Sequence, residues 1–431
     1  MKKTLIPKIP DQLVHWINAI IKALPLRSIP TFLELLLGAM MTKTGFITDV
    51  QLMVNAQKHW TTYYKWLEKG IWSYLHLAVA LAKLIVHVFK DSIFILIIDD
   101  SLVARSSKKA PGCKIHHQHA HKPNRPTFML GQCWVSLSVA IGTGSSIPVL
   151  HRLIDNTGNT SKLAAMNVLL RVMLKVFPKK TTYVSADCWY MRKNVILKTL
   201  QTGFHTVGQV RIDTALFDLP SPYSGKGRPR KYGKKYSAEV INQLPIIRTV
   251  LDIYGKKRRV HYRTAMTKAR FLDGLTVKAV WVQIENTKGK MSKPHLILST
   301  DTHLSAEQVI AYYAKRWTTE PMFNLLKNSW GLNTAWQQSK QTLCRWVQIL
   351  TIALAFPQML VEKGNESTTQ LVEIPPWRDE KKLTAGIIRQ GLTRTFYHVA
   401  IRTCWDRKQR KFKPPGYEDM EQTCDQFLKS A

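Results

Sequence analysis

The apolar run at residues 92–98 limits what this chain can fold into more than any other segment. It is rich in β-branched residues and lacks the polar alternation of a half-exposed strand, which indicates a central strand buried on both faces. The run ends in Asp99, Asp100 and Ser101. Because such a strand needs helices on both sides of its sheet, we expect an α/β fold with acidic side chains where this strand ends.

A second acid follows a second strand. Residues 182–186 predict a short strand that ends in Asp187, and a helix is expected at about 190–200. Ligands of α/β proteins bind where the strands end. Asp100 and Asp187 are therefore candidates for a shared site, although an acid in this position is also common as a helix cap.

A third candidate acid, Glu320, lies in a helical pattern with Tyr313, Arg316 and Lys327. At about 100° per residue, their spacing places the four side chains within an arc of about 60°. An acid among cations suits metal-assisted chemistry on a phosphate backbone, because the acid holds the metal while the cations bind phosphates. The alternative is an exposed helix with an ordinary Glu–Arg pair. Pro321 disfavours helical backbone at the preceding residue, so a kink or restart is expected there.

The composition favours a polyanionic partner. The chain has 63 Lys and Arg against 28 Asp and Glu, a formal net charge of +35 that is spread along its length. Such a charge fits DNA, and a hydrophobic content of 45% excludes a disordered basic protein. The six cysteines form no CxxC pair and the N-terminus has no long apolar segment. We therefore expect a reduced, soluble, cytoplasmic protein without a signal peptide.

The pattern divides the 431 residues into five segments. These are a helical, candidate DNA-binding domain (1–90), the first part of a catalytic domain (91–210), a β-rich basic insertion (211–292), the second part of the catalytic domain (293–363) and a basic C-terminal segment (364–431). Helices expected at 31–41 and 50–72 form either a helix-turn-helix or an ordinary core pair. The apolar residues 346–356 are too few to span a bilayer and predict a buried part of a helix at 340–363.

Asp100, Asp187 and Glu320 together form a candidate catalytic and metal-binding set. Three carboxylates that converge at one edge of a sheet can hold two Mg²⁺ ions about 4 Å apart, and Mn²⁺ is expected to substitute. One ion would activate water or a 3′-hydroxyl, and the other would stabilise the leaving oxygen.

These motifs resemble those of DDE transposases of bacterial insertion sequences, in the group with the Tyr-Arg-Glu-Lys signature. The signature has two, three and six residues between its members, and every interval is matched by Tyr313, Arg316, Glu320 and Lys327. The family's first acid follows an apolar strand and precedes Thr or Ser, which favours Asp100 over Asp99. Its second acid ends a strand and precedes an aromatic pair, as Asp187 does. The resemblance covers about residues 90–360.

The resemblance implies an RNase H-like catalytic domain with a β-rich insertion, preceded by a helical domain. It also implies cut-and-paste transposition, in which the ends of an insertion sequence are cleaved and their 3′-hydroxyls are transferred to target DNA. The expected partners are double-stranded DNA and at least one further copy of the chain in a synaptic complex, in a bacterial, nucleoid-associated setting. Two alternatives remain open: a non-catalytic DNA-binding protein derived from such an enzyme, and a structure-specific nuclease on the same fold.

The resemblance also assigns DNA contacts. Arg316 and Lys327 would bind phosphates, and Tyr313 would orient the scissile or a flanking phosphate. A hairpin intermediate with a flipped base stacked on a tryptophan of the insertion is expected in this group. Trp281 is the candidate for that role, and ordinary packing on a strand is the alternative.

Two further segments have polar or basic patterns. Arg228, Arg230 and Lys231 lie in a basic loop that either contacts DNA phosphates or, through its Gly-Arg-Pro-Arg core, resembles an AT-hook in a narrow minor groove. Residues 113–121 contain one Cys and four His. Their spacing fits no familiar zinc finger, so a polar loop near the active site is favoured over a metal site.

Overall fold

The computed structural model describes residues 9–415, except 55, 57, 118–125, 143, 156–158, 224, 226, 287, 375, 378–381 and 398. The strands of its main sheet are β1 (Phe94–Ala104), β2 (Cys113–His117), β3 (Phe128–Ala140), β4 (Ile147–Leu153), β5 (Thr182–Ala186), β6 (His205–Val210), β7 (Leu216–Phe217), β8 (Ile247–Ile253), β9 (Lys256–Ala269), β10 (Leu275–Ile284) and β11 (His295–Ser299). They pair in the order β2-β3-β1-β5-β6-β11-β10-β9-β7, with β4 on β3 and β8 on β9.

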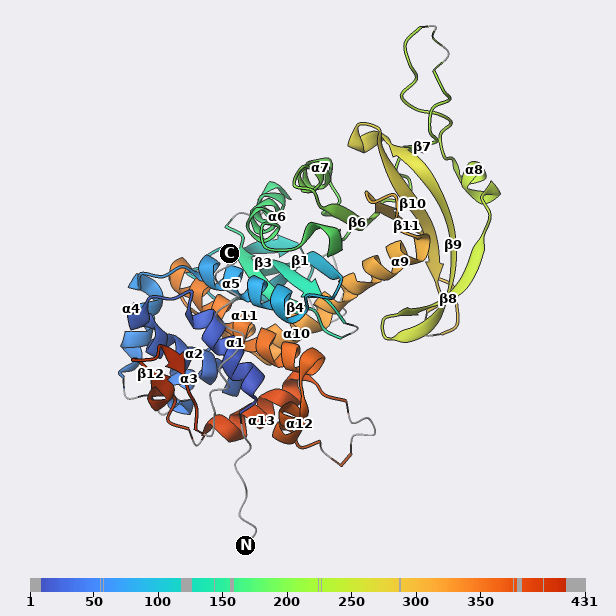
Figure 1. Ribbon diagram of the computed structural model, residues 1–431. Helices are drawn as coiled ribbons and strands as arrows, with labels where there is room; N and C mark the ends of the chain where they lie inside the picture. The colour runs from blue at the N-terminus through green and yellow to red at the C-terminus, as the bar shows by residue number, and fades with distance from the viewer. Residues whose placement is uncertain are drawn as a thin grey trace.

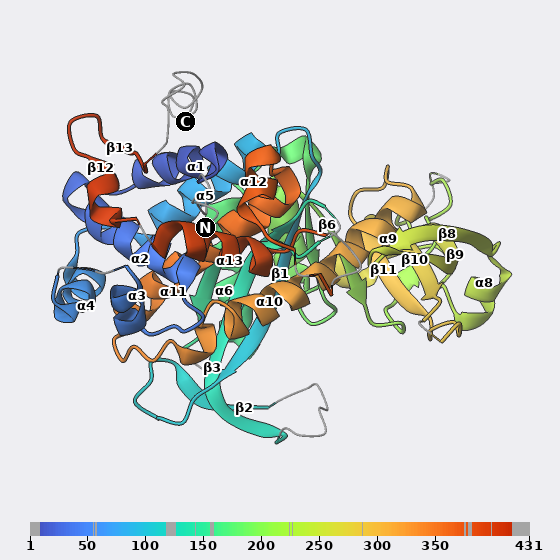
Figure 2. The same ribbon diagram turned by 90° about the horizontal axis from the view of Figure 1, so that it is seen from below.

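The helices are α1 (Asp11–Ile21), α2 (Ile29–Met41), α3 (Ile47–Met53), α4 (Trp60–Lys69), α5 (Tyr74–Val88), α6 (Asn159–Met173), α7 (Lys193–Gln201), α8 (Ala238–Gln243), α9 (Ala306–Ala314), α10 (Thr319–Asn328), α11 (Lys340–Lys363), α12 (Glu366–Leu371) and α13 (Ala385–Tyr397). A small hairpin of β12 (Trp405–Asp406) and β13 (Lys411–Phe412) follows them. Helices pack on both sides of the sheet (Figures 1 and 2), which confirms the α/β prediction.

Five strands form the RNase H-like part of the sheet, in the order β4-β3-β1-β5-β6. β3 is antiparallel to both β1 and β4, whereas β5 is parallel to both β1 and β6. β5 has the bounds that the sequence predicted. Because β1 and β5 are parallel neighbours, the residues that follow the apolar part of each strand lie at the same edge.

β1 is longer than expected. The sequence predicted that the strand ends at Asp99, but it continues through Asp99 and Asp100 to Ala104. The reason is its partner: β3 pairs with β1 without interruption from Ile95 to Ala104, so the backbone stays extended past the acids. The two aspartates are therefore strand residues, and their side chains must point to opposite faces of the sheet.

The apolar residues of β1 define these two faces. Ile95 and Ile97 belong to a buried cluster that includes Ile310 and Tyr313 of α9. Phe94, Leu96 and Ile98 belong to the larger core on the other face, which includes α5 and α6. Continuing the alternation puts Asp99 on the α9 face and Asp100 on the α6 face.

The strands of the insertion continue the same sheet. β11 pairs antiparallel with β6, and β10 and β9 follow outward from it. In Figure 1 these strands and α8 make up the lobe on the right, and α9 runs from that lobe back toward the centre of the molecule. Figure 2 shows the other end of the sheet, where β2 and β3 reach away from the helices.

The N-terminal segment is helical, but the single helix expected at 50–72 is wrong. α3 ends at Met53 and α4 begins only at Trp60. Lys58, which lies in the break, forms an ion pair with the buried Glu34 of α2 at 3.0 Å, and the next residue, His59, caps α4. Since this ion pair draws the chain between the two helices toward the core, Lys58 is not placed to face phosphates.

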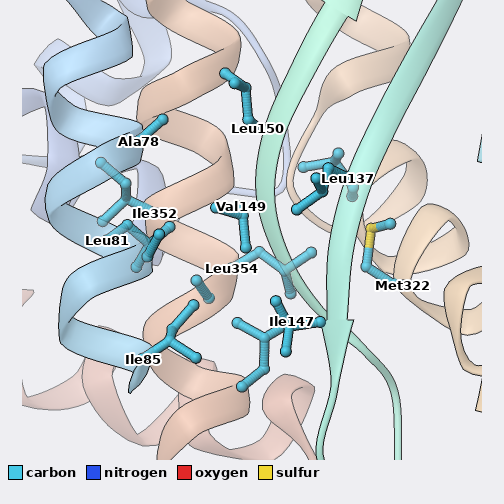
Figure 3. Close-up of a cluster of buried hydrophobic side chains, with 14 of the residues drawn as sticks. Ala78, Leu81, Ile85, Leu137, Ile147, Val149, Leu150, Met322, Ile352 and Leu354 are labelled. Carbon is cyan, nitrogen blue, oxygen red and sulfur yellow. The ribbon is translucent and has the colours of Figure 1, made fainter. Parts of the chain in front are cut away.

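α11 is the central helix of the molecule and has the bounds that the sequence predicted. By length and composition it could cross a membrane, but 89% of its most apolar window is buried inside the protein. It packs between α5 and strand β4, as Figure 3 shows for Ile352 and Leu354 against Leu81 and Val149. It therefore acts as a core helix that is buried nearly all round, and not on one side only.

Candidate active site

Two acids, Asp99 and Asp187, lie close to Arg316, and Asp99 is the more enclosed of them. Arg316 Nη1 lies 3.0 Å from Asp99 Oδ2, and the backbone N–H of Asp100 donates to Asp99 Oδ1 at 2.8 Å. The Asp99 side chain is 18% exposed. Burial raises the pKa of Asp99 to about 7; Arg316 opposes the rise, while Asp187 and Asp100 add to it. A carboxyl with this pKa is about half ionised near neutral pH, and further positive charge beside it favours the ionised form.

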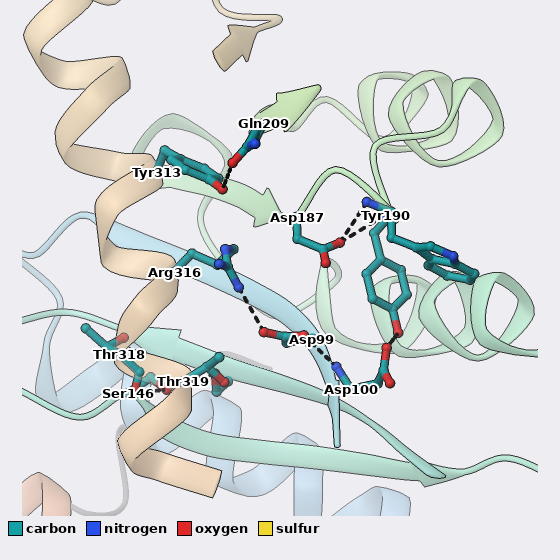
Figure 4. Close-up of polar contacts among 12 residues, drawn as sticks. Asp99, Asp100, Ser146, Asp187, Tyr190, Gln209, Tyr313, Arg316, Thr318 and Thr319 are labelled. Atoms are coloured by element: carbon teal, nitrogen blue, oxygen red, sulfur yellow. Dashed lines mark hydrogen bonds and ion pairs between the residues drawn. The ribbon is translucent and has the colours of Figure 1, made fainter. Parts of the chain in front are cut away.

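Asp187 directly follows β5 and lies beside Asp99 (Figure 4). Its Oδ1 accepts the backbone N–H groups of Trp189 and Tyr190, at 3.0 and 3.1 Å. Burial raises the pKa of Asp187, partly offset by these amides and by Arg316, and Asp100 adds to the rise. Two carboxylates thus repel each other in a partly buried place, which is the arrangement that a divalent cation relieves.

The segment that bears Glu320 changes helix type where Pro321 predicted a restart. α9 ends at Ala314, a 3-10 turn covers Lys315–Thr318, and α10 starts at Thr319. Pro321 therefore falls in the first turn of α10, where its missing N–H leaves no helical hydrogen bond unmade. Arg316 lies in the 3-10 turn, and its guanidinium lies 5.1 Å from the ring centre of Trp317.

Glu320 is exposed at the start of α10. It follows Arg316 by four residues, but the single helical face expected from that spacing is not formed, because Arg316 is buried in the 3-10 turn and Glu320 is exposed on α10. Within the part of the chain that the structure describes, no three His, Cys, Asp or Glu side chains are gathered closely enough to form a ready-made metal site. Asp99 and Asp187 are brought together, and Glu320 lies on a separate element, the first turn of α10.

Asp100, the first acid that the sequence favoured, points to the other face. Tyr190 donates its hydroxyl to Asp100 Oδ1 at 2.7 Å, and Lys162 Nζ lies 2.9 Å from Asp100 Oδ2. The Cys133 thiol contacts the same Oδ2 at 3.5 Å. Both oxygens of Asp100 are therefore occupied by groups of the protein, unlike those of Asp187.

The expected DNA contacts on the signature helix are engaged inside the protein. The Tyr313 hydroxyl donates to Gln209 at 2.7 Å, and the ring is buried. Lys327 Nζ donates to the backbone carbonyl of Leu102 at 2.6 Å. Together with the Arg316–Asp99 pair, these bonds fasten α9 and α10 to the sheet.

Trp281 does not lie where a flipped base could reach it. The side chain is only 6% exposed and packs against Tyr236, with ring centres 5.6 Å apart. Its strand position faces the core of the insertion, so the packing alternative describes this conformation. Local sequence patterns did not single out an exposed aromatic pair, Tyr254 and Trp317, which are 42% and 43% exposed with ring centres 6.0 Å apart. They line a cavity of about 410 Å³ that also includes Lys315 and Pro321.

The basic loop of the insertion is exposed, including Arg228, Arg230 and Lys231. Cys113 and His116 lie on strand β2, and His116 is buried. Positions 119 and 121 of the histidine-rich segment lie outside the described residues. The described part of that segment forms an edge strand of the sheet.

The chain belongs to the DDE superfamily endonuclease family, whose model matches residues 27–270, more than half of the sequence. The match includes both aspartate motifs and confirms the resemblance to DDE enzymes. One solved structure that the chain matches is the cryo-EM structure of a piggyBac transposase synaptic complex with hairpin DNA. It is 12% identical in sequence and has a TM-score of 0.36, covering 90% of this chain and 77% of that one. No curated protein matches the sequence.

Proposed function

We propose that this protein is a transposase that cleaves DNA strands at the ends of a mobile element and transfers them to target DNA. The observation that carries the proposal is the pairing of Asp99 with Asp187 beside Arg316, in a DDE endonuclease with a net charge of +35. Strand cleavage and strand joining are both phosphoryl transfers, and both need negative charge to be neutralised around the reacting phosphate.

The residues at this site fit Mg²⁺, and Mn²⁺ as a substitute. Carboxylate oxygens are the ligands that hard divalent cations prefer, and the repulsion between Asp99 and Asp187 favours a bound cation. Asp99, Asp187 and Glu320 would hold the metal, with a second ion as in other two-metal phosphoryl-transfer sites. When bound, the metal would supply an activated water or 3′-hydroxyl and charge stabilisation of the leaving oxygen.

In this proposal Asp99 replaces Asp100 as the first metal ligand. Two observations support the change: Asp99 shares a face of the sheet with α9, and the charge of Asp187 helps to raise its pKa. Arg316 holds Asp99 while no metal is bound, and its guanidinium is suited to bind a DNA phosphate beside the metal. Tyr313 and Lys327 keep their proposed roles as phosphate contacts. For this, DNA binding would have to break their bonds to Gln209 and to the Leu102 carbonyl.

For an unpaired base, Tyr254 and Trp317 replace Trp281 as the proposed stacking surface. Both rings are exposed beside the signature helix, and arginine guanidinium groups lie over them, Arg258 over Tyr254 and Arg316 over Trp317. Aromatic faces with neighbouring arginines suit unpaired bases of any sequence. The exposed loop with Arg228, Arg230 and Lys231 would add contacts to DNA phosphates.

The test uses DNA duplexes that carry the repeats flanking the gene, incubated with the protein and Mg²⁺ or Mn²⁺. Wild-type protein should nick the duplex at the repeat end and join the 3′ end to a second duplex. Glu320→Gln should abolish both products and leave binding within about threefold, because the amide keeps the shape but loses the charge of a metal ligand. Glu366→Gln, at an exposed acid of α12, is the matched control and should be fully active.

The outcomes separate the three functions. Joined product supports the transposase. Cleavage without joining would indicate a nuclease on the same fold, and binding without either product would indicate a non-catalytic DNA-binding protein. Because two ends must be held together, the active form is proposed to be a dimer or a larger complex, which light scattering with and without end DNA would measure.

A further inference from the structure

The face of the sheet opposite Asp99 carries a second polar cluster, which the proposed chemistry does not use. It consists of Asp100 on β1, Cys133 on β3, Lys162 on α6 and Tyr190 after β5. Tyr190 has no exposed surface, and its hydroxyl reaches Asp100 at 2.7 Å across the core. Burying a phenol and partly burying a charged pair is costly unless these groups bond to each other. The bonds within the cluster offset this cost, and the question is what role the cluster has.

Tyr190 also holds Asp187. Its backbone N–H donates to the Asp187 side chain at 3.1 Å and to the Asp187 carbonyl, also at 3.1 Å. Trp189 donates its N–H to the same side-chain oxygen at 3.0 Å. The residues after β5 thus form a tight turn whose amides fix one oxygen of Asp187, Oδ1, and do not engage the other.

One residue therefore connects two carboxylates on opposite faces. The backbone of Tyr190 fixes the carboxylate of Asp187, and its hydroxyl is fixed by Asp100 on β1. Asp99, the neighbour of Asp100 in the same strand, is the proposed first metal ligand. Any shift of the turn relative to β1 must stretch the Tyr190–Asp100 bond, and it would change the separation of Asp99 and Asp187 as well.

We propose that Asp100 is a positioning residue that, through Tyr190, sets the distance between the two metal-binding aspartates. The inference rests on the proposed function of Asp99 and Asp187 as metal ligands. Lys162 of the same cluster adds two contacts. Its ammonium forms an ion pair with Asp100 at 2.9 Å and lies 5.3 Å from the ring centre of Trp189 in the turn after β5. The contacts of this cluster thus connect β1, α6 and the turn after β5.

The first experiment measures the turn itself in protein without metal or DNA. Hydrogen exchange of the peptide that contains the amides of Trp189 and Tyr190 should become about tenfold faster in Tyr190→Phe and in Asp100→Ala. Tyr183→Phe is the matched control, because Tyr183 makes a similar bond to Asp301 at 3.0 Å elsewhere on the sheet. That control should leave the exchange of the Asp187 turn unchanged. Equal exchange in wild type and Tyr190→Phe would overturn the proposal.

The second experiment measures the metal requirement. Tyr190→Phe and Asp100→Ala should each raise the Mn²⁺ concentration for half-maximal DNA nicking by about tenfold, as loss of a group that orients a ligand commonly does. The rate at saturating Mn²⁺ should stay within about threefold of wild type. The double variant should be no worse than Asp100→Ala, because both changes break one bond. Additive effects would overturn the proposal.

Asp100→Asn keeps an oxygen that can accept the Tyr190 hydroxyl and guards against a variant that does not fold. It should rescue most of the Mn²⁺ affinity lost in Asp100→Ala. If Asp100→Asn instead abolishes nicking as Asp99→Asn does, Asp100 is itself a ligand and the positioning role is refuted. Failure of the proposed function is a distinct result: Asp99→Asn would then nick DNA normally, whatever the exchange of the turn shows.

Discussion

The two faces of strand β1 carry two adjacent acids, Asp99 and Asp100, whose side chains contact different residues. On the α9 face, Asp99 meets one arginine and the charge of Asp187, and its pKa is raised to about 7. On the α6 face, Asp100 is bonded to Lys162 and Tyr190, with both oxygens occupied. The comparison teaches that an acid whose pKa is raised beside a second carboxylate is the better candidate for a metal ligand, and an acid bonded to a buried tyrosine and a lysine the better candidate for a structural role.

The largest expected effect separates the two acids directly. Asp99→Asn should reduce DNA nicking at least about 1,000-fold, because a metal ligand contributes several kcal/mol to the transition state. Asp100→Asn should reduce it by about threefold or less, since the amide oxygen still accepts a hydrogen bond from Tyr190. Single-turnover nicking at saturating Mn²⁺ is the measurement. Losses of equal size would show that the two faces do not have different roles.

The next effect concerns stability in the absence of metal. The folded-state pKa of Asp99 is about 7, and its unfolded value is about 4. A raised pKa stabilises the fold below the unfolded value, and this contribution is lost as the pH rises from about 4 to about 7. The free energy of unfolding of wild type should therefore fall relative to Asp99→Asn over this window, by on the order of 2 to 4 kcal/mol.

Urea denaturation of both proteins between pH 5 and pH 8 measures this difference. Asp99→Asn also loses the ion pair with Arg316. Because the arginine stays charged throughout, the unpaired guanidinium changes the free energy of unfolding of the variant by a nearly constant amount over this pH range. Mg²⁺ at pH 8 should restore wild type and leave Asp99→Asn unchanged. A difference that does not vary with pH would contradict the assigned environment of Asp99.

The smallest expected effect is on DNA binding, and it tests whether the DNA-binding surface on the α9 face includes the exposed rings of Tyr254 and Trp317. Trp317→Ala and Tyr254→Ala should each weaken binding to DNA with an unpaired base by about 10-fold to 100-fold, the range of one stacking contact. Fully paired duplex should be affected less, and both variants should fold, since the rings are exposed. By contrast, Trp281→Ala should destabilise the fold by about 3 to 5 kcal/mol, as for other buried tryptophans. Fluorescence anisotropy measures the DNA binding of Trp317→Ala and Tyr254→Ala, and thermal melting measures the stability of Trp281→Ala.

Much of the architecture could be predicted from the sequence, because strands β5 and β10 and helix α11 have strong local patterns. The position of Pro321 also predicted the helix restart before α10. The run at 92–98 was different: every residue after Ser92 is apolar, so it contained no alternation that would assign side chains to one face of the sheet. The choice between Asp99 and Asp100 therefore had to rest on a neighbouring serine, and it favoured the acid that the structure places away from α10.

Other differences have the same origin in long-range contacts. The break between α3 and α4 depends on Lys58 reaching Glu34, 24 residues away in the sequence. The end of β1 depends on how far β3 continues to pair with it. Trp281 and Trp317 have similar local chemistry, and only the packing of the insertion makes one buried and the other exposed.

The sequence by itself determined an α/β protein with a strongly positive charge, three candidate acid motifs and the spacing of the signature helix. Those properties are local or additive, so periodicity and composition are enough to identify them. Only the tertiary structure decided which of two adjacent aspartates faces Asp187 and Arg316, and which aromatic rings stay exposed. That decision depends on the face each strand presents to its neighbours, because the same carboxylate is a ligand or a structural tie according to what packs against it.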